Sequence, residues 1–192
     1  MKPTLFAIVE THLKDKIPER LMPKSYSWIG KNRRGKKPKG GVGIFVKKEV
    51  TVIDDNLLSS RNDNHERMWI SINSDHFPKT AVGVVYMPVD GSDKQTITEL
   101  FTEILENISE LEKDGYNIIL CGDFNAKILK KCEITNKAII DCNQGFNGEL
   151  LFDLLEVTNL SLANALLQCK GFYTWQRRNR KLAIDYVLMS PC

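Results

Sequence analysis

The chain lacks the features that mark several classes of protein. Its five cysteines are scattered, odd in number and never form a Cys-x-x-Cys pair. This spacing fits neither a disulfide framework nor a zinc site, and it favours a reducing compartment. No run approaches the roughly 20 apolar residues of a membrane span, and the apolar run near the amino terminus is too short for a secretory signal peptide. We therefore expect an intracellular protein, nuclear or cytoplasmic, that is neither secreted nor bound to a membrane.

A strong excess of charge and a nucleotide-binding loop are also missing. Lys and Arg number 27, Asp and Glu number 24, and the net charge is +3 at pH 7. Contact with nucleic acid must therefore depend on where the basic residues cluster. The Gly-x-x-x-x-Gly-Lys loop of nucleoside-triphosphate enzymes does not occur. The 192 residues suit one domain, over residues 1–192, and no feature indicates an obligate protein partner, so we expect a monomer.

Short apolar runs and one long amphipathic segment predict a layered α/β fold. Apolar residues at helical spacing predict a helix over residues 94–113, with Ser92 or Asp93 at its start and Gly115 at its end. A second helix is predicted over residues 148–157. Strands are predicted at residues 5–9, 42–46, 68–72, 81–86, 117–122, 160–163, 173–176 and 183–189.

The most informative run is Asn-Ile-Ile-Leu-Cys-Gly-Asp-Phe-Asn-Ala-Lys, residues 117–127. It reads as a buried strand that ends in a carboxylate and an amide. Since successive strand side chains point to opposite faces, we expect Asp123 and Asn125 on one face and Phe124 on the other.

Other predicted strands end in the same way. Glu10 and Tyr86 stand at the ends of apolar runs, and Asp185 lies inside another. In layered α/β proteins functional groups gather at the carboxyl ends of strands, which predicts one shared site. Each residue alone fits a solvated strand end equally well. Carboxylates, an amide and a phenol without a His or Cys cluster favour Mg²⁺ or Mn²⁺ over zinc, and phosphodiester hydrolysis over transfer from ATP.

Five ordered motifs carry a family resemblance that covers almost the whole chain. They are Glu-Thr-His-Leu (residues 10–13), Gly-Val-Gly-Ile-Phe-Val (41–46), Val-Val-Tyr-Met-Pro (84–88), Gly-Asp-Phe-Asn-Ala (122–126) and Ala-Ile-Asp-Tyr-Val-Leu (183–188). The sequence resembles the endonuclease/exonuclease/phosphatase superfamily, and within it the endonuclease domain of non-LTR retrotransposons, which is similar to apurinic/apyrimidinic endonucleases. Thr174-Trp175, Asn147-Gly148 and Leu162-Ala163-Asn164 support that subfamily. The resemblance implies a DNase I-like two-sheet sandwich flanked by helices.

The resemblance also implies a role for each candidate residue. Glu10 would bind the metal ion, Mg²⁺ or Mn²⁺. Asp123 would activate or orient the attacking water, or protonate the leaving oxygen. Asn125 would hold a phosphate oxygen and Tyr86 would hydrogen-bond the scissile phosphate. Asp185 would orient a catalytic histidine.

The sequence departs from the family pattern at both ends. Family members begin with one more strand and end with a strand preceded by Ser-Asp-His, so we expect a partial domain in which Asp185 lacks its histidine. The motif Ser74-Asp75-His76 lies in a predicted turn, roughly 20 Å from the active-site end of its strand. We interpret His76 as a solvated turn residue. Loss of the terminal strands also predicts bare apolar edges at residues 5–9 and 184–189.

Two basic clusters are candidates for binding DNA. Their members, with an adjacent tryptophan, are Lys31, Arg33, Arg34, Lys36 and Lys37, and Trp175, Arg177 and Arg178. Solvated loops would give the same composition. Trp175 would stack on a base, or belong to the core.

The sequence therefore predicts a Mg²⁺-dependent, DNA-nicking endonuclease of a mobile element, with weak or no activity in this chain. Two alternatives remain open. One is a catalytically dead fragment that retains DNA binding. The other is a lipid or inositol-phosphate phosphodiesterase of the same superfamily.

Overall fold

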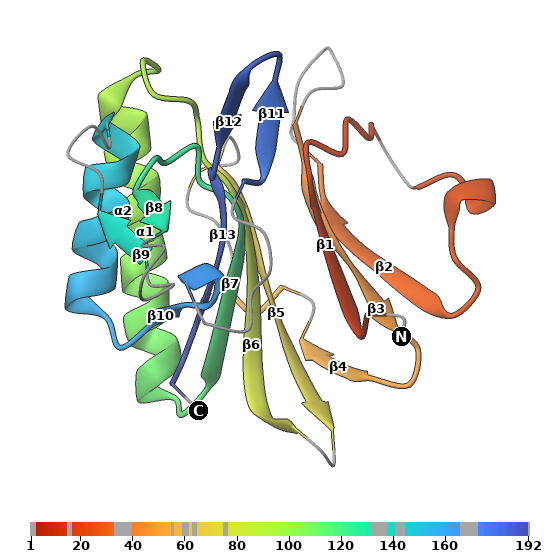
Figure 1. Cartoon of the computed structure of the whole chain (residues 1–192). Coiled ribbons are helices and arrows are strands. Elements are labelled where there is room, and N and C mark those ends of the chain that lie inside the picture. The colour runs from red at the N-terminus through yellow and green to blue at the C-terminus, as the bar shows by residue number, and fades with distance from the viewer. Residues whose placement is uncertain are drawn as a thin grey trace.

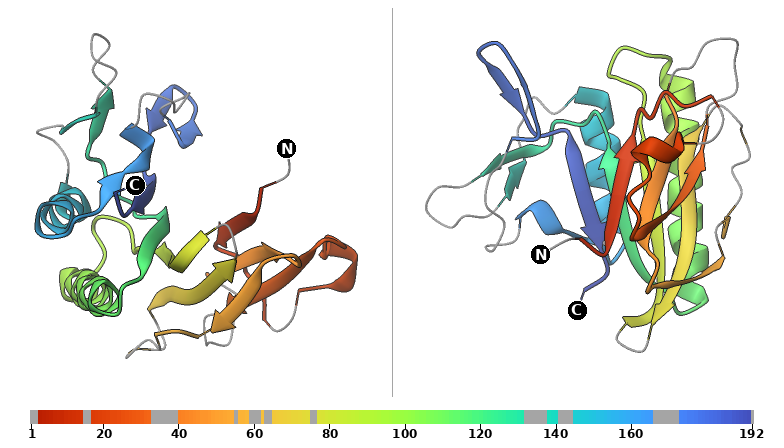
Figure 2. Two further views of the ribbon diagram at one scale, coloured as in Figure 1. Left: turned by 90° about the horizontal axis from the view of Figure 1, so that it is seen from below. Right: turned by 90° about the vertical axis from the view of Figure 1, so that its right-hand side faces the viewer.

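The computed structural model describes residues 3–14, 17–32, 40–54, 56–58, 62, 65–74, 77–131, 138–140, 145–165 and 173–191. Two β-sheets pack face to face, and two helices cover the outer face of the larger sheet (Figures 1 and 2). The α/β sandwich expected from the sequence is confirmed.

The larger sheet has six strands in the order β10-β13-β7-β6-β5-β4. Neighbouring strands are antiparallel except β6 and β7, which run parallel. Parallel neighbours need a long crossover, and helix α1 provides it. The strands are β4 (Thr51–Asp54), β5 (Glu66–Ser74), β6 (Phe77–Tyr86), β7 (Asn117–Asp123), β10 (Ser161–Leu162) and β13 (Asp185–Met189).

Helix α1 (Lys94–Lys113) matches the sequence prediction at both ends. The Asp93 carboxylate accepts a hydrogen bond of 3.0 Å from the Thr96 backbone N–H, and Gly115 follows with a φ of 73°. The apolar face of α1 is buried against the larger sheet together with helix α2 (Gly145–Val157). Helix α2 begins three residues before the predicted position.

The smaller sheet has the order β1-β3-β2, formed by β1 (Leu5–Val9), β3 (Val42–Lys47) and β2 (Tyr26–Lys31). Alternate β3 side chains Val42, Ile44 and Val46 pack against β5 and β6, which forms the core between the sheets. Phe45 points the other way and contacts aromatic rings on β1 and β2. A short 3₁₀ turn, η1 (Glu19–Leu21), lies between β1 and β2 in the chain.

Several short elements were not predicted from the sequence. They are β2, β4, β8 (Leu129–Lys131), β9 (Ala138–Ile140), β12 (Arg180–Leu182) and the 3₁₀ turn η2 (Ala163–Ala165). Strand β11 (Trp175–Arg177), which was predicted, pairs with β12 as a hairpin. Apart from β2, these strands have only three or four residues, which is too short for a clear apolar periodicity.

The two predicted bare edges have different outcomes. Strand β13 pairs with β7 along its length, and on its other edge β10 pairs with Leu188 and Met189, so the expectation of a bare edge at residues 184–189 is wrong for these last two residues. Strand β1 pairs with β3, and no other strand in the described part of the chain pairs with its second edge.

Two further features of the described residues bear on the sequence analysis. No helix among them is long and apolar enough to cross a membrane. Cys121 is a free thiol in the core between the sheets, and burial raises its pKa to about 11. The other four cysteines lie outside the described residues.

Candidate active site

Four polar side chains form a row across the larger sheet. In the strand register Asp185 pairs with Asp123, Asp123 pairs with Tyr86, and Tyr86 pairs with Glu66. Directly paired residues on neighbouring strands have side chains on the same face. The apolar residues two positions away on β5, β6 and β7 face the core between the sheets, so the row faces the smaller sheet. This set of four residues is called the polar row below.

Glu10 reaches the polar row from the smaller sheet. It directly follows β1 and has a φ of 51°, in the left-handed region. Its carboxylate lies close enough to Tyr86 and Asp123 to raise the pKa of both groups. The structure therefore brings together Glu10, Tyr86, Asp123 and Asp185, which the sequence analysis had assigned to one site.

Burial and the surrounding carboxylates raise the pKa of two groups at this site. Burial raises the pKa of Asp123 to about 6, and the carboxylates of Asp185 and Glu10 add to the shift, whereas the Asn125 backbone N–H lowers it. Burial and the nearby Glu10 carboxylate raise the pKa of Tyr86 to about 12. A carboxyl group that titrates near neutral pH suits proton transfer, and a phenol that stays protonated suits donation to an anion.

Asn125 lies near Asp123 for a different reason from the one expected. Strand β7 ends at Asp123, and Asn125 has a φ of 46°, so strand alternation does not extend to it. Its backbone N–H donates to Asp123 Oδ1 at 2.8 Å, and its Nδ2 donates to the Met87 carbonyl at 2.8 Å. An amide nitrogen has two N–H groups, so Asn125 can donate the second to a ligand oxygen. Phe124 is fully buried.

Two polar residues from the subfamily motifs support the backbone around the start of β13. Thr174 Oγ1 accepts hydrogen bonds of 3.1 Å from the backbone N–H groups of Ile184 and Asp185. Asn164 donates to the Asp185 carbonyl at 3.2 Å and accepts from the Val187 N–H at 2.7 Å. These side chains fix the backbone that carries Asp185.

Asn147 likewise holds the backbone of the loops after β6 and β7 through hydrogen bonds. Its Nδ2 donates to the carbonyl oxygens of Pro88 at 2.8 Å and Phe124 at 3.1 Å. In the sequence these motifs indicated only a subfamily, and the backbone hydrogen bonds that their side chains make were not predicted. Glu66 was missed as well, because it stands between His65 and Arg67 at the start of β5, where a carboxylate gives no contrast with its neighbours.

The site's oxygen donors fit a hard divalent cation. Mg²⁺ is usually held by one or two carboxylates and completes its shell with water and phosphate oxygens. Glu10 is exposed and faces the carboxylates of the polar row, which fits such an open arrangement. Among the described residues no group of three or more His, Cys, Asp or Glu side chains is arranged to hold a metal ion by itself, so a cation here would depend on one or two carboxylates, water and phosphate.

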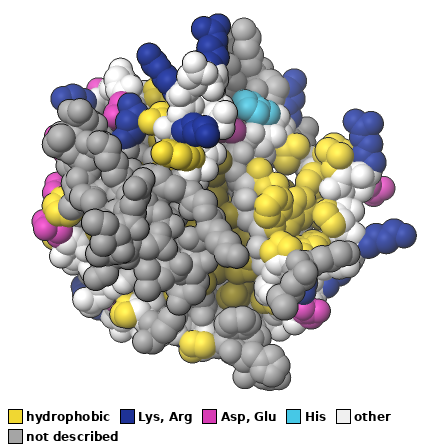
Figure 3. Space-filling model, in the orientation of Figure 1, with side chains coloured by type: hydrophobic (Ala, Val, Ile, Leu, Met, Phe, Trp, Pro, Cys, Tyr) yellow, Lys and Arg dark blue, Asp and Glu magenta, His cyan; other side chains and the backbone are white. Residues whose placement is uncertain are grey.

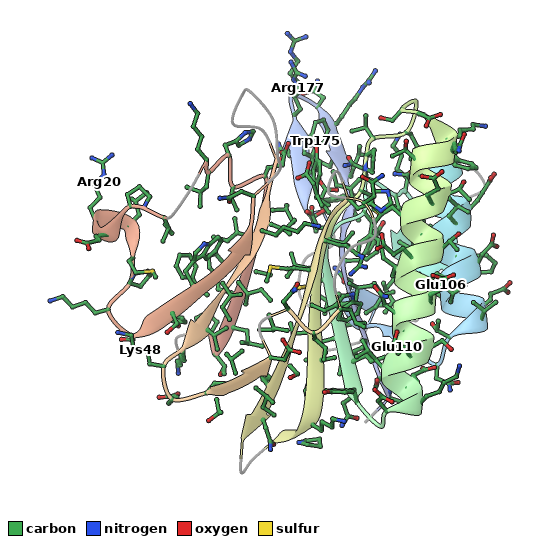
Figure 4. The ribbon with its side chains drawn as sticks, turned by 180° about the vertical axis from the view of Figure 1, so that it is seen from behind. Arg20, Lys48, Glu106, Glu110, Trp175 and Arg177 are labelled. Atoms are coloured by element: carbon green, nitrogen blue, oxygen red, sulfur yellow. The ribbon has the colours of Figure 1, made fainter. Side chains whose placement is uncertain are left out.

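The second basic cluster forms an exposed hairpin at one end of the molecule. Strands β11 and β12 meet at a tight turn in which Arg178 has a φ of 52°. Arg177 and Trp175 lie on this hairpin, far from Arg20 on the smaller-sheet side (Figure 4). A hollow of about 530 Å³ is lined by Trp175, Arg177, Arg178, Asn179 and Arg180. Figure 3 shows Lys and Arg side chains at this end.

The first basic cluster is only partly described. Arg33, Arg34, Lys36 and Lys37 lie outside the described residues. Lys31 is half-buried, and its Nζ donates to the His65 carbonyl at 3.1 Å, so part of its role is structural.

No histidine in the described part of the chain hydrogen-bonds to the Asp185 side chain. His65 is buried, and its Nδ1 lies 2.6 Å from Glu103 Oε2, in a network that includes Arg67. His12 is exposed, and the turn residue His76 lies outside the described residues.

The two-sheet sandwich, with acidic and phenolic groups at the carboxyl ends of its strands, defines a DNase I-like fold. The chain belongs to the Endonuclease/Exonuclease/phosphatase family, whose sequence profile matches residues 2–191. The comparison with curated proteins finds no match.

Solved structures of this family share the fold at low sequence identity. An AP endonuclease from Archaeoglobus fulgidus superposes with a TM-score of 0.62 at 14% identity, over 98% of this chain and 77% of the other. The 3′ phosphatase NExo from Neisseria, bound to a product DNA hairpin, has a TM-score of 0.61 at 19% identity, also over 98% of this chain and 77% of the other. The endonuclease domain of TRAS1, a telomere-specific non-LTR retrotransposon, has a TM-score of 0.55 at 15% identity, over 87% of this chain and 68% of the other.

Proposed function

We propose that this site hydrolyses phosphodiester bonds in DNA with Mg²⁺ or Mn²⁺, as a nicking endonuclease of the kind found in mobile elements. The observation that carries the proposal is the meeting of Glu10, Tyr86, Asp123 and Asp185 at one place between the sheets. The likeness to the TRAS1 endonuclease domain and to a phosphatase bound to DNA supports a nucleic-acid substrate.

Each residue of the site has a role that its environment suits. Glu10, with a carboxylate of the polar row, would hold the cation. When bound, the cation neutralises charge on the phosphate. Protonated Tyr86 donates a hydrogen bond to a phosphate oxygen, and the second Nδ2 N–H of Asn125 donates to another. Asp123, with its pKa of about 6, takes the proton of the attacking water or supplies one to the leaving oxygen.

The β11–β12 hairpin supplies the contact with the DNA backbone. Arg177 and Arg178 are exposed and attract phosphates without reading sequence. The left-handed conformation of Arg178 is what a two-residue hairpin loop requires, and it places Arg178 at the turn between the paired Arg177 and Arg180.

We expect the chain to bind DNA but to nick it only slowly. An aspartate that orients a histidine contributes little without it, and no histidine in the described residues pairs with Asp185. This observation favours the second candidate function, a domain that binds DNA and cleaves it weakly or not at all.

Nicking of supercoiled plasmid with Mg²⁺ tests the proposal. We expect slow conversion to open circles that a chelator stops and that Asp123→Asn lowers about 100-fold or more. Asp153→Asn, at an exposed position on α2, is the matched control and should match the wild-type rate.

Parallel assays separate the alternatives. Binding of a fluorescent duplex without any nicking would favour the DNA-binding domain. Release of phosphate from inositol phosphates, with neither nicking nor duplex binding, would contradict the proposal in favour of the lipid and inositol-phosphate branch.

A further inference from the structure

Glu66 is a member of the polar row to which the proposed reaction assigns no role. It lies beside Tyr86 in the register of β5 and β6 and is 7% exposed. Its carboxylate crosses the sandwich to the smaller sheet, where Oε2 accepts a hydrogen bond of 2.6 Å from the Gly41 backbone N–H. A buried carboxylate that binds a backbone N–H makes a strong, charge-assisted contact.

The turn that Glu66 binds holds the segment that carries Glu10. The carbonyl oxygen of Gly41 accepts from the Thr11 backbone N–H at 3.1 Å, and that of Gly40 accepts from the His12 N–H at 2.8 Å. The chain of contacts therefore runs from Glu66 through Gly40 and Gly41 to the two residues that follow Glu10.

This segment needs external support because its backbone is strained. Glu10 and His12 both have a φ of 51°, a conformation that side chains other than glycine rarely adopt. Such residues persist only where the surrounding structure holds them. The two backbone hydrogen bonds to Gly40 and Gly41, with a longer one of 3.4 Å from Thr11 Oγ1 to the Gly40 carbonyl, support the segment on this side.

Gly40 allows the carboxylate to come this close. It has a φ of 64°, and a Cβ atom there would overlap the Glu66 carboxylate. Glycine at this position therefore satisfies both the turn and the approach of Glu66.

We propose that Glu66 is a positioning residue that clamps the turn at Gly40 and Gly41 and so directs Glu10 toward the polar row. The inference rests on the proposed function, since it gives Glu10 its orientation for binding the cation. Glu66 acts through the backbone and touches neither cation nor phosphate.

Hydrogen exchange without metal tests the clamp independently of any activity. In Glu66→Ala the amides of Thr11, His12 and Gly41 should exchange about tenfold faster than in the wild type. Glu66→Gln keeps an oxygen acceptor for Gly41 and should stay close to the wild type. Glu110→Gln, on the exposed face of α1 (Figure 4), is the control and should change none of these amides.

Mn²⁺ titration followed by electron paramagnetic resonance tests the consequence for the cation. Glu66→Ala should weaken Mn²⁺ binding about tenfold, an effect typical of residues that orient a metal ligand, while Glu66→Gln should weaken it far less. If Glu66→Ala does not fold, Gly40→Ala is the second variant, since it displaces the carboxylate from the turn, and it should show the same two effects.

The outcomes separate the clamp from the proposed function. Unchanged exchange at Thr11 and His12 in Glu66→Ala would overturn the clamp, and so would a Glu66→Gln variant as impaired as Glu66→Ala, because the charge would then matter more than the acceptor. Wild-type protein that binds no Mn²⁺ would overturn the proposed function, while the exchange comparison would still decide whether Glu66 holds the turn.

Discussion

At the scale of single residues, the site combines carboxylates whose like charges repel one another. Asp123 lies beside Asp185 in the register and faces Glu10, and burial adds to the cost of its charge. A raised carboxyl pKa means that the folded state binds the proton more tightly than the unfolded state does. Ionised Asp123 therefore destabilises the fold in the absence of a cation.

The sign of this effect gives a pH-dependent prediction. The unfolded pKa is 3.8 and the folded one about 6, so the fold loses stability as pH rises between them, and the loss is complete above the folded pKa. In a chelator, Asp123→Asn should raise the free energy of unfolding by about 1 kcal/mol at pH 8, after discounting for partial exposure, and by almost nothing at pH 4. Thermal melts followed by circular dichroism at both pH values measure this.

The control for this prediction is Asp153→Asn, which should leave the melting temperature unchanged at either pH. If Asp123→Asn and the wild type melt at the same temperature at pH 8, the ionised Asp123 carboxylate does not destabilise the fold and the prediction is wrong.

The sequence predicted some site residues and missed others for a physical reason. Glu10, Tyr86 and Asp123 interrupt apolar runs where strands end, and this pattern is visible in the sequence. Glu66 stands at the start of a strand in a charged stretch, where a carboxylate gives no contrast with its neighbours. The contact between Glu66 and Gly41 joins two sheets, and such a distant pairing has no local sequence pattern.

At the scale of elements, the proposed contact with DNA is the β11–β12 hairpin. Its basic residues are exposed, and Trp175 at its base is half-buried and belongs to neither core cluster. The sequence predicted β11 but not β12, because Arg180–Leu182 is mainly basic and lacks an apolar alternation. Helix α1 was predicted to the residue because periodicity and caps both act locally.

Removal of one hairpin charge should weaken DNA binding in a salt-dependent way. Arg177→Ala should lower duplex affinity several-fold at low salt and reduce the slope of log affinity against log salt by about 1, since one phosphate contact is lost. Fluorescence anisotropy at several salt concentrations measures both quantities.

Arg20→Ala removes another exposed charge, on the smaller-sheet side and away from the hairpin (Figure 4), and should change neither the affinity nor the slope. Equal effects of the two substitutions would contradict a role specific to the hairpin and indicate attraction by net charge alone.

At the scale of the whole molecule, the two sheets differ in how they are covered. The larger sheet carries α1 and α2 on its outer face, while the smaller sheet exposes hydrophobic side chains near β1 and β2 (Figure 3). Phe6, on the outer face of β1, is 53% exposed and stacks on Phe45 at 6.4 Å. An apolar strand with one unpaired edge is a site for association between chains.

Phe6→Lys should therefore reduce self-association of the protein. A lysine on an edge strand disfavours strand addition by charge repulsion and by its solvation. Light scattering at increasing protein concentration should show less large material than for the wild type. Val157→Lys, at another exposed apolar position, should leave scattering unchanged. Equal scattering by Phe6→Lys and wild type would show that β1 is not the surface through which copies associate.

The parallel pairing of β6 with β7 also sets the order in which the molecule can assemble. Tyr86 and Asp123 meet only after α1 has returned the chain to the same edge of the sheet, and Asp185 joins from β13 near the end of the described chain. Contacts between residues so distant in sequence form slowly because loop-closure entropy opposes them. Helix α1 can thus appear early in refolding, whereas the polar row exists only when nearly the whole chain has reached its native topology.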